Sequence, residues 1–130
     1  MSKYLIINAD DFGSFKGANL AISDLLTDPN SALTSSTIMA PCPWAPDAVC
    51  FAKKNPKLCI GVHWTFTNEW SGYRWAPVAH NNTESLRDEY GYMHHESDDF
   101  EKHANLDEVY AEAVAQIEFC LLYTSPSPRD

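Results

Sequence analysis

Two adjacent carboxylates, Asp10 and Asp11, follow a short apolar run near the start of the chain. The run belongs to the stretch from Tyr4 to Ala9, and its unbroken apolar character is typical of a strand buried on both faces of a parallel sheet. The two carboxylates then lie at the carboxyl end of that strand, where open α/β sheets and (β/α) barrels place their chemistry. Neighbouring carboxylates repel each other unless they share a proton or hold a cation. The pair therefore predicts a catalytic or cation-binding site, although Asp also starts turns and caps helices.

A histidine occupies the matching position in a later segment. Residues 58–63 form another predicted strand, and His63 is its last residue. In a parallel sheet His63 would reach the same rim as Asp10 and Asp11, and these side chains predict a divalent metal site, because imidazole suits Zn²⁺ and carboxylate suits Zn²⁺ or Mg²⁺. A lone histidine hydrogen-bonded at the surface is the alternative. Period-two alternation assigns the residues at this strand end to two faces, one with His63, Thr65 and Thr67 and the other with Val62, Trp64 and Phe66.

Alternating strand and helix patterns position these side chains. Apolar residues at helical spacing predict a helix over residues 15–26, and a turn signal ends it. Residues 33–40 are rich in β-branched side chains and predict a strand, and residues 45–54 predict a second helix. The order β-α-β-α-β predicts an α/β fold whose parallel sheet has right-handed crossovers.

The second half of the chain is less regular. Residues 68–105 show no clear periodicity, and a loop of this length is usually functional or disordered. Asn105 and Glu108 resemble a capping box at the start of a last helix. We expect a partial domain over residues 1–122 and an irregular tail over residues 123–130, whose Ser-Pro repeats resemble translated adaptor or vector sequence. The last helix has one apolar stripe, made of Leu106, Val109, Tyr110, Ala113, Ile117, Cys120 and Leu121.

Composition limits the classes of function. The 130 residues suffice for one small domain, and a hydrophobic content of 45% excludes a disordered chain. A net charge of −9 argues against binding to nucleic acid or to an anionic membrane surface. The sequence shows no secretory leader and no membrane span. Four cysteines without a CxxC pair predict four buried thiols in a reducing compartment, and therefore a cytoplasmic protein.

Three segments together resemble the N-terminal half of the YdjC-like carbohydrate deacetylases, a group that includes chitooligosaccharide deacetylases. The segments are Ile7 to Gly13, Thr34 to Thr37, and Ile60 to Thr67, and the similarity covers about residues 3 to 122 in order and spacing. Asn68 to Pro77 is similar to a branch of the family that has an aromatic loop after the metal histidine. The resemblance implies the N-terminal part of a distorted (β/α) barrel that uses a divalent metal to remove acetyl groups from N-acetylated sugars.

The resemblance also implies roles for individual residues. Asp10 corresponds to the catalytic base, and Asp11 and His63 correspond to metal ligands. A further histidine ligand belongs to a His-rich motif after the last helix, which this chain does not contain. That absence predicts weak metal binding and an inactive, truncated chain. Trp70, Tyr73 and Trp75 are candidates for stacking on a sugar, or alternatively for packing in a core.

The sequence therefore predicts a metal-dependent hydrolase acting on a small carbohydrate, with Mg²⁺ or Zn²⁺ as cofactor. A non-catalytic carbohydrate-binding or interaction module is the alternative, although such a module would not need two repelling carboxylates. A homodimer of the full-length protein stays open, as do the sugar, the acetyl group removed and the identity of the general acid.

Overall fold

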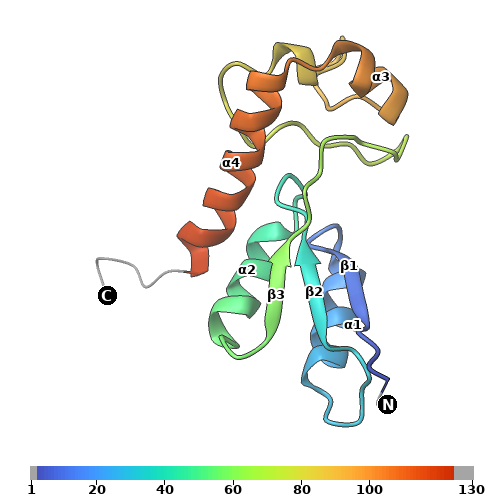
Figure 1. The fold of residues 1–130 in the computed structure, drawn as a ribbon, viewed down its shortest axis with the longest axis vertical. Helices are drawn as coiled ribbons and strands as arrows, with labels where there is room; N and C mark the ends of the chain where they lie inside the picture. The colour runs from blue at the N-terminus through green and yellow to red at the C-terminus, as the bar shows by residue number, and fades with distance from the viewer. Residues whose placement is uncertain (1–2, 125–130) are drawn as a thin grey trace.

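Three parallel strands form one sheet, in the order β1-β2-β3, in the computed structural model, which describes residues 3–124 (Figure 1). The strands are β1 (Asn8–Phe12), β2 (Ser35–Ile38) and β3 (Cys59–Val62), and the helices α1 (Lys16–Thr27) and α2 (Ala45–Lys54) connect them. A 3₁₀ helix, η1 (Glu84–Leu86), and the helices α3 (Ser97–His103) and α4 (Leu106–Thr124) follow. The predicted α/β order and the parallel sheet are confirmed. The three strands of the described part do not close into a barrel, so the barrel stays a prediction for a longer chain.

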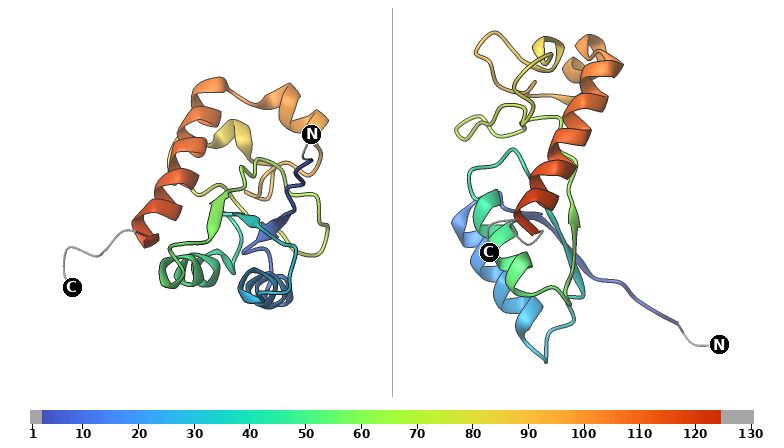
Figure 2. Two further views of the ribbon diagram at one scale, coloured as in Figure 1. Left: turned by 60° about the horizontal axis from the view of Figure 1, so that its bottom comes forward. Right: turned by 90° about the vertical axis from the view of Figure 1, so that its left-hand side faces the viewer.

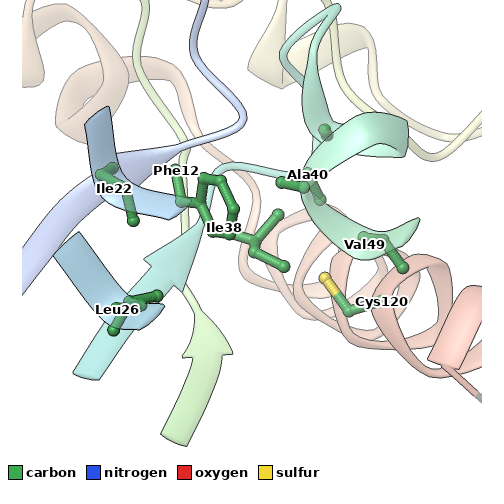
Figure 3. Packing of buried hydrophobic residues seen from close by; sticks show 9 residues of the cluster. Phe12, Ile22, Leu26, Ile38, Ala40, Val49 and Cys120 are labelled. Atoms are coloured by element: carbon green, nitrogen blue, oxygen red, sulfur yellow. The ribbon is translucent and has the colours of Figure 1, made fainter. Parts of the chain in front are cut away.

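The helices α1 and α2 cover one face of the sheet, as the right-hand view of Figure 2 shows. Side chains from this face of the strands and from both helices form the main core, part of which is drawn in Figure 3. Its buried members are Phe12, Ile22, Leu26, Ile38, Ala40, Ala45, Ala48, Val49 and Cys120. The opposite face carries the polar residues Asn8, Asp10, Ser35 and Thr37. Residues of the two faces alternate along β2, as the pleat of a strand requires.

A β-bulge interrupts the pairing of β1 with β2. Ala9 pairs with Ser36 and Phe12 pairs with Ile38, so two residues of β1 lie opposite one residue of β2. The two residues are Asp10 and Asp11, and the φ angle of Asp11 is 64°. Bulges of this kind re-aim side chains, and here the bulge falls on the predicted catalytic residues.

The first strand begins later than the sequence predicts. Tyr4, Leu5 and Ile6 are almost fully exposed instead of buried, and pairing with the neighbouring strand reaches back only to Ile7, whose carbonyl accepts a hydrogen bond from the Thr34 amide at 3.0 Å. The reason is that β1 is an edge strand and its leading residues extend away from both helices (Figure 2). An apolar run alone does not guarantee a neighbour on each face.

The segment between β3 and α4 is ordered and lies beyond the carboxyl ends of the strands (Figure 1). Long-range hydrogen bonds hold it, including one from the Asn68 amide to the His94 carbonyl at 2.8 Å. The Arg74 guanidinium also lies 2.7 Å from the Asp88 carboxylate. The helix α3 within this segment was not predicted, because it has seven residues and none of them is buried. It therefore shows no apolar period.

The last helix begins as predicted, but its most buried positions are mainly polar. The Asn105 side chain caps it by accepting a hydrogen bond from the Asp107 amide at 2.8 Å, whereas Glu108 binds Ser85 instead of closing a capping box. The apolar stripe is only partly buried, because Leu106, Tyr110 and Leu121 are largely exposed whereas Cys120 is buried. The buried positions, one helical turn apart, are Glu112, Gln116 and Cys120.

Other expectations have mixed outcomes. The prediction of four buried thiols is wrong, because Cys42 and Cys120 are buried whereas Cys50 and Cys59 are exposed. The helix α4 continues through Thr124, and residues 125–130, which make up most of the predicted tail, lie outside the described residues. Within residues 3–124, none of the helices has the length and apolar character needed to cross a membrane.

Candidate functional site

The side chain of Asp10 belongs to a hydrogen-bonded row across the polar face of the sheet. Its Oδ1 atom accepts hydrogen bonds from the side-chain amide (Nδ2) of Asn8 at 2.6 Å and from the Thr37 hydroxyl at 3.2 Å. Asn8 in turn accepts a hydrogen bond from the Ser35 hydroxyl at 2.6 Å. These neutral donors orient the carboxylate without supplying a counter-charge. Asn8 and Thr37 belong to the segments that resemble the family, but neither was singled out from the sequence.

The structure brings the other two predicted residues to the same place. The Nδ1 atom of His63 lies 3.8 Å from Oδ1 of Asp11 and 3.3 Å from the Thr37 hydroxyl. Thr37 thus lies between His63 and Asp10. The backbone amide of His63 donates to the Ile38 carbonyl at 2.8 Å, which continues the pairing of β2 and β3 by one residue. Asp11 and His63 therefore lie side by side at the carboxyl ends of the strands, whereas Asp10 is linked to His63 only through Thr37.

A tight turn fixes the bulge against the helices. Gly13 has a φ angle of +93°, and a Cβ atom at this position would lie 2.9 Å from the Cα atom of Ala45, so glycine is required for both reasons. The buried Asn19 accepts a hydrogen bond from the Gly13 amide at 2.7 Å and donates to the Asp47 carboxylate at 2.8 Å. Sequence analysis did not identify Asn19, because a polar residue in a helix gives no sign of such a distant partner.

A cavity of about 160 Å³ opens beside Asp11 and His63. All residues from His63 to Thr67 line it, so the predicted alternation between two faces does not hold here. The reason is that β3 ends at Val62, and the pleat ends with it. Other lining residues are Ser14, Phe15, Met39, Glu69, Trp70, Tyr73 and Trp75.

The three predicted carbohydrate-binding aromatic residues line this cavity but differ in exposure. Trp70 is 50% exposed and offers an open ring to a ligand. The Tyr73 hydroxyl donates a hydrogen bond to the Ser14 carbonyl, which ties the aromatic segment to the turn after β1. Trp75 is only 5% exposed, and it packs in a second buried cluster with Met39, Cys42 and Met93. Core packing therefore accounts for most of the surface of Trp75.

The charges around the cavity are acidic. Asp11 and Glu69 are its two carboxylates, and no Lys or Arg appears among the lining residues of the described chain. Beneath it, burial, together with the nearby charge of Asp11, raises the pKa of the Cys42 thiol to about 12. Burial, together with the Cys42 thiol, raises the pKa of Tyr73. Both groups stay protonated at neutral pH, so Tyr73 remains a hydrogen-bond donor.

Asp11 and His63 suit a divalent metal as part of a site. Two ligand atoms of one ion, each about 2.0–2.2 Å from it, lie about 3–4 Å apart, and the carboxylate and imidazole atoms here are 3.8 Å apart. Over residues 3–124 there is no group of three His, Cys, Asp or Glu side chains that could hold a metal ion. The described residues therefore fit two ligands of a metal site, and a third would have to come from elsewhere.

Comparisons with known proteins identify the family. A family profile described as YdjC-like protein matches residues 4–123. A carbohydrate deacetylase of Enterococcus faecalis is 38% identical over 118 residues, which is 89% of this chain and 42% of the relative. A chitooligosaccharide deacetylase of Yersinia enterocolitica is 39% identical over 67 residues, which is 52% of this chain and 26% of the relative.

A solved structure shows the same fold. It is a protein of Enterococcus faecalis V583 assigned to cellobiose-phosphate cleavage, with a TM-score of 0.71 and 32% identity, and the match covers 92% of this chain and 44% of that protein. The chain thus spans less than half the length of these relatives. The family match over nearly all of the sequence shows that the chain belongs to the YdjC-like family.

Proposed function

We propose that this chain forms the N-terminal part of a metal-dependent hydrolase that removes acetyl groups from N-acetylated sugars. The observation that supports this most is that Asp11 and His63 lie 3.8 Å apart beside a cavity with an aromatic wall, while Thr37 links His63 to Asp10 on the polar face of the sheet. The relatives named carbohydrate deacetylase give the reaction class. Neither a turn nor a helix cap needs two carboxylates and an imidazole at one strand end.

The proposed roles are those that the family resemblance implies for each side chain. Asp11 and His63 would hold the metal, which when bound makes its water more acidic and polarises the acetyl carbonyl. Asp10 would accept the proton of the attacking water as general base. Its hydrogen bonds from Asn8 and Thr37 keep the carboxylate pointing to the polar face. The general acid for the departing amine would come from outside this chain.

The cavity suits an uncharged sugar. Trp70 and the exposed Trp64 offer rings for the apolar face of a pyranose. Glu69 can accept hydrogen bonds from sugar hydroxyl groups. The carboxylates also suit the ammonium group of the deacetylated product.

The test is acetate release from N-acetylated chitooligosaccharides by a protein in which this chain is joined to the C-terminal part of a full-length relative. Acetate release that a chelator stops and Zn²⁺ or Mg²⁺ restores supports the proposal. Asp24→Asn, a change at an exposed carboxylate of α1, is the matched control for substitutions of Asp10 or Asp11. Sugar binding with no acetate release under any metal would instead support a carbohydrate-binding module.

A further inference from the structure

The helix α4 contributes two fully buried polar side chains, and one of them binds the segment His63–Thr67 that lines the cavity. Gln116 and Glu112 are both 0% exposed. The Oε1 atom of Gln116 accepts a hydrogen bond from the Thr65 amide at 3.0 Å, and its Nε2 atom donates to the Thr65 carbonyl at 2.6 Å. One side chain thus satisfies both backbone groups of Thr65. A neighbouring strand would do this in a sheet, but β3 has already ended at Val62.

Glu112 fixes the orientation of the Gln116 amide. Its Oε1 atom accepts hydrogen bonds from Gln116 Nε2 at 2.8 Å and from the Val78 amide at 3.0 Å. Its Oε2 atom accepts from the Ala79 amide at 2.8 Å. A carboxylate with these three donors cannot accommodate the oxygen of Gln116 at the same place, because oxygen faces oxygen only at an electrostatic cost. The nitrogen of Gln116 must therefore face Glu112, and its oxygen must face the Thr65 amide.

The contact with Thr65 reaches the candidate metal ligand. The Thr65 hydroxyl donates to the His63 carbonyl at 2.9 Å, while the His63 amide is held by Ile38 of β2. His63 is thus fixed by the sheet on one side and by Thr65 on the other. Thr65 in turn is fixed by α4, whose Gln116 lies 51 residues further along the chain.

We propose that Gln116, oriented by Glu112, is a positioning residue that sets the place of the His63–Thr67 segment in the site. It acts through the backbone of Thr65 and does not touch the reacting atoms. The importance of this segment for chemistry rests on the proposed function, whereas the positioning itself does not. The competing explanation is that Gln116 only fills space under the segment.

The test compares Gln116→Met with Val49→Ala in the 130-residue chain. Methionine keeps most of the volume and loses both hydrogen bonds to Thr65, and Val49→Ala lowers stability from the main core without touching the segment. At equal global stability, reached by adjusting urea, amide hydrogen exchange at residues 63–68 should be faster in Gln116→Met by about tenfold or more. The NMR signals of the His63 imidazole should shift only in Gln116→Met. Titration with Zn²⁺ alone should show affinity weakened by about tenfold relative to Val49→Ala.

Glu112→Gln is a second variant in case Gln116→Met does not fold. It should raise the rate of exchange at residues 63–68 above that of the Val49→Ala control, because the new side-chain amide cannot accept all three hydrogen bonds that the Glu112 carboxylate accepts. Equal exchange rates in these variants and in Val49→Ala would overturn the proposal. If exchange is faster in Gln116→Met but the wild-type chain binds no Zn²⁺, the positioning role would be upheld and the metal role of His63 would be contradicted. Unchanged Zn²⁺ affinity in a variant with faster exchange would overturn the link to the site.

Discussion

At the scale of single residues, the bulge explains how adjacent aspartates reach one site. Neighbouring residues of a regular strand point to opposite faces, so Asp10 and Asp11 would be separated by the sheet. The extra residue and the positive φ angle of Asp11 re-aim its side chain toward His63 while Asp10 stays on the polar face. A non-glycine residue in the left-handed backbone conformation lowers the stability of the fold by roughly 1 kcal/mol or more, and Asp tolerates this conformation better than most residues.

Asp10 and Asp11 should respond differently to substitution if their proposed roles are right. In the longer protein, Asp10→Asn should reduce acetate release by a factor of about 100 or more, since it removes the base, while Zn²⁺ affinity changes little. Asp11→Asn should weaken Zn²⁺ binding itself, because an amide is a poor ligand for this ion. Isothermal titration and acetate assays check both, with Asp24→Asn as control. Equal loss of metal binding in the two variants would contradict the assignment.

Gly13 and Gly72 offer a matched pair. Gly13→Ala should lower the free energy of unfolding by roughly 2–4 kcal/mol, because it combines a φ angle of +93° with a contact of 2.9 Å to Ala45. No heavy atom lies within 4 Å of a Cβ atom at Gly72, so Gly72→Ala should change stability by less than about 1 kcal/mol. Urea unfolding of both variants measures the difference. Similar stabilities would show that the turn is not held against α2.

Cys42 should make the protein less stable at alkaline pH. Burial raises the pKa of its thiol from about 9 to about 12, so between these values the unfolded chain loses a proton that the folded protein keeps. Stability is therefore fully present below pH 9 and falls as the pH rises toward 12. Cys42→Ala should flatten this decline in unfolding experiments between pH 8 and about 11, whereas Cys50→Ala, at an exposed thiol, should leave the slope unchanged. A slope that is the same in both variants would contradict the burial of Cys42.

At the scale of elements, α4 shows why a polar residue can be the buried one. Its inward positions hold Glu112 and Gln116, which supply hydrogen bonds to a segment that has left the sheet. Glu112→Ala would leave three donors, one buried and two half-buried, without their acceptor and should destabilise the protein by roughly 3–5 kcal/mol. Glu118→Ala, at an exposed position of the same helix, is the control and should have little effect. Thermal or urea unfolding distinguishes them, and equal effects would show that the buried network contributes no stability.

The sequence predicts the elements best where local signals agree with tertiary packing. The helix α2 occupies the predicted residues 45–54, because its proline start, its polar end and its apolar face are all local. The strand ends also predict that Asp10, Asp11 and His63 reach one rim of the sheet, but the bulge that aims Asp11 toward His63 could not be predicted from them. Gln116 could not be found in this way, because its partner Thr65 is fixed only by the folded chain.

Other failures have the same physical origin. The apolar run from Tyr4 to Ile7 was predicted as a buried strand, yet only the fold decides which edge of the sheet is covered. The apolar stripe on α4 is likewise only partly covered in the folded chain. Hydrophobic patterns show which surfaces gain from burial, and they do not show whether this chain supplies the covering surface.

At the scale of the whole molecule, two exposed apolar surfaces lie outside the candidate site and bear on solubility. One is the leading segment of β1, and the other is the outer side of α4, with Leu106, Tyr110, Leu121 and Leu122. Both edges of a three-stranded sheet also leave backbone groups open to pairing. These features favour self-association of the chain in isolation.

The 130-residue chain should accordingly release little or no acetate and tend to aggregate, whereas a version extended to the length of its relatives should be active and more soluble. The physical reasons are that the described residues offer only two ligands for the proposed metal and that apolar surface is exposed. Acetate assays and light scattering on both lengths provide the comparison. Chelator-insensitive activity in the short chain would refute the metal-hydrolase mechanism.

The contact between Gln116 and Thr65 has a consequence for how this chain can change in evolution. Gln116 recognises the backbone of Thr65, so it places the same demand on any residue there except proline, which lacks the amide hydrogen. The wall of the cavity can therefore change its side chains, and with them the shape offered to a ligand, while the backbone contacts that hold His63, the proposed metal ligand, stay the same. Selection can then act on specificity at one set of positions and on catalytic geometry at another.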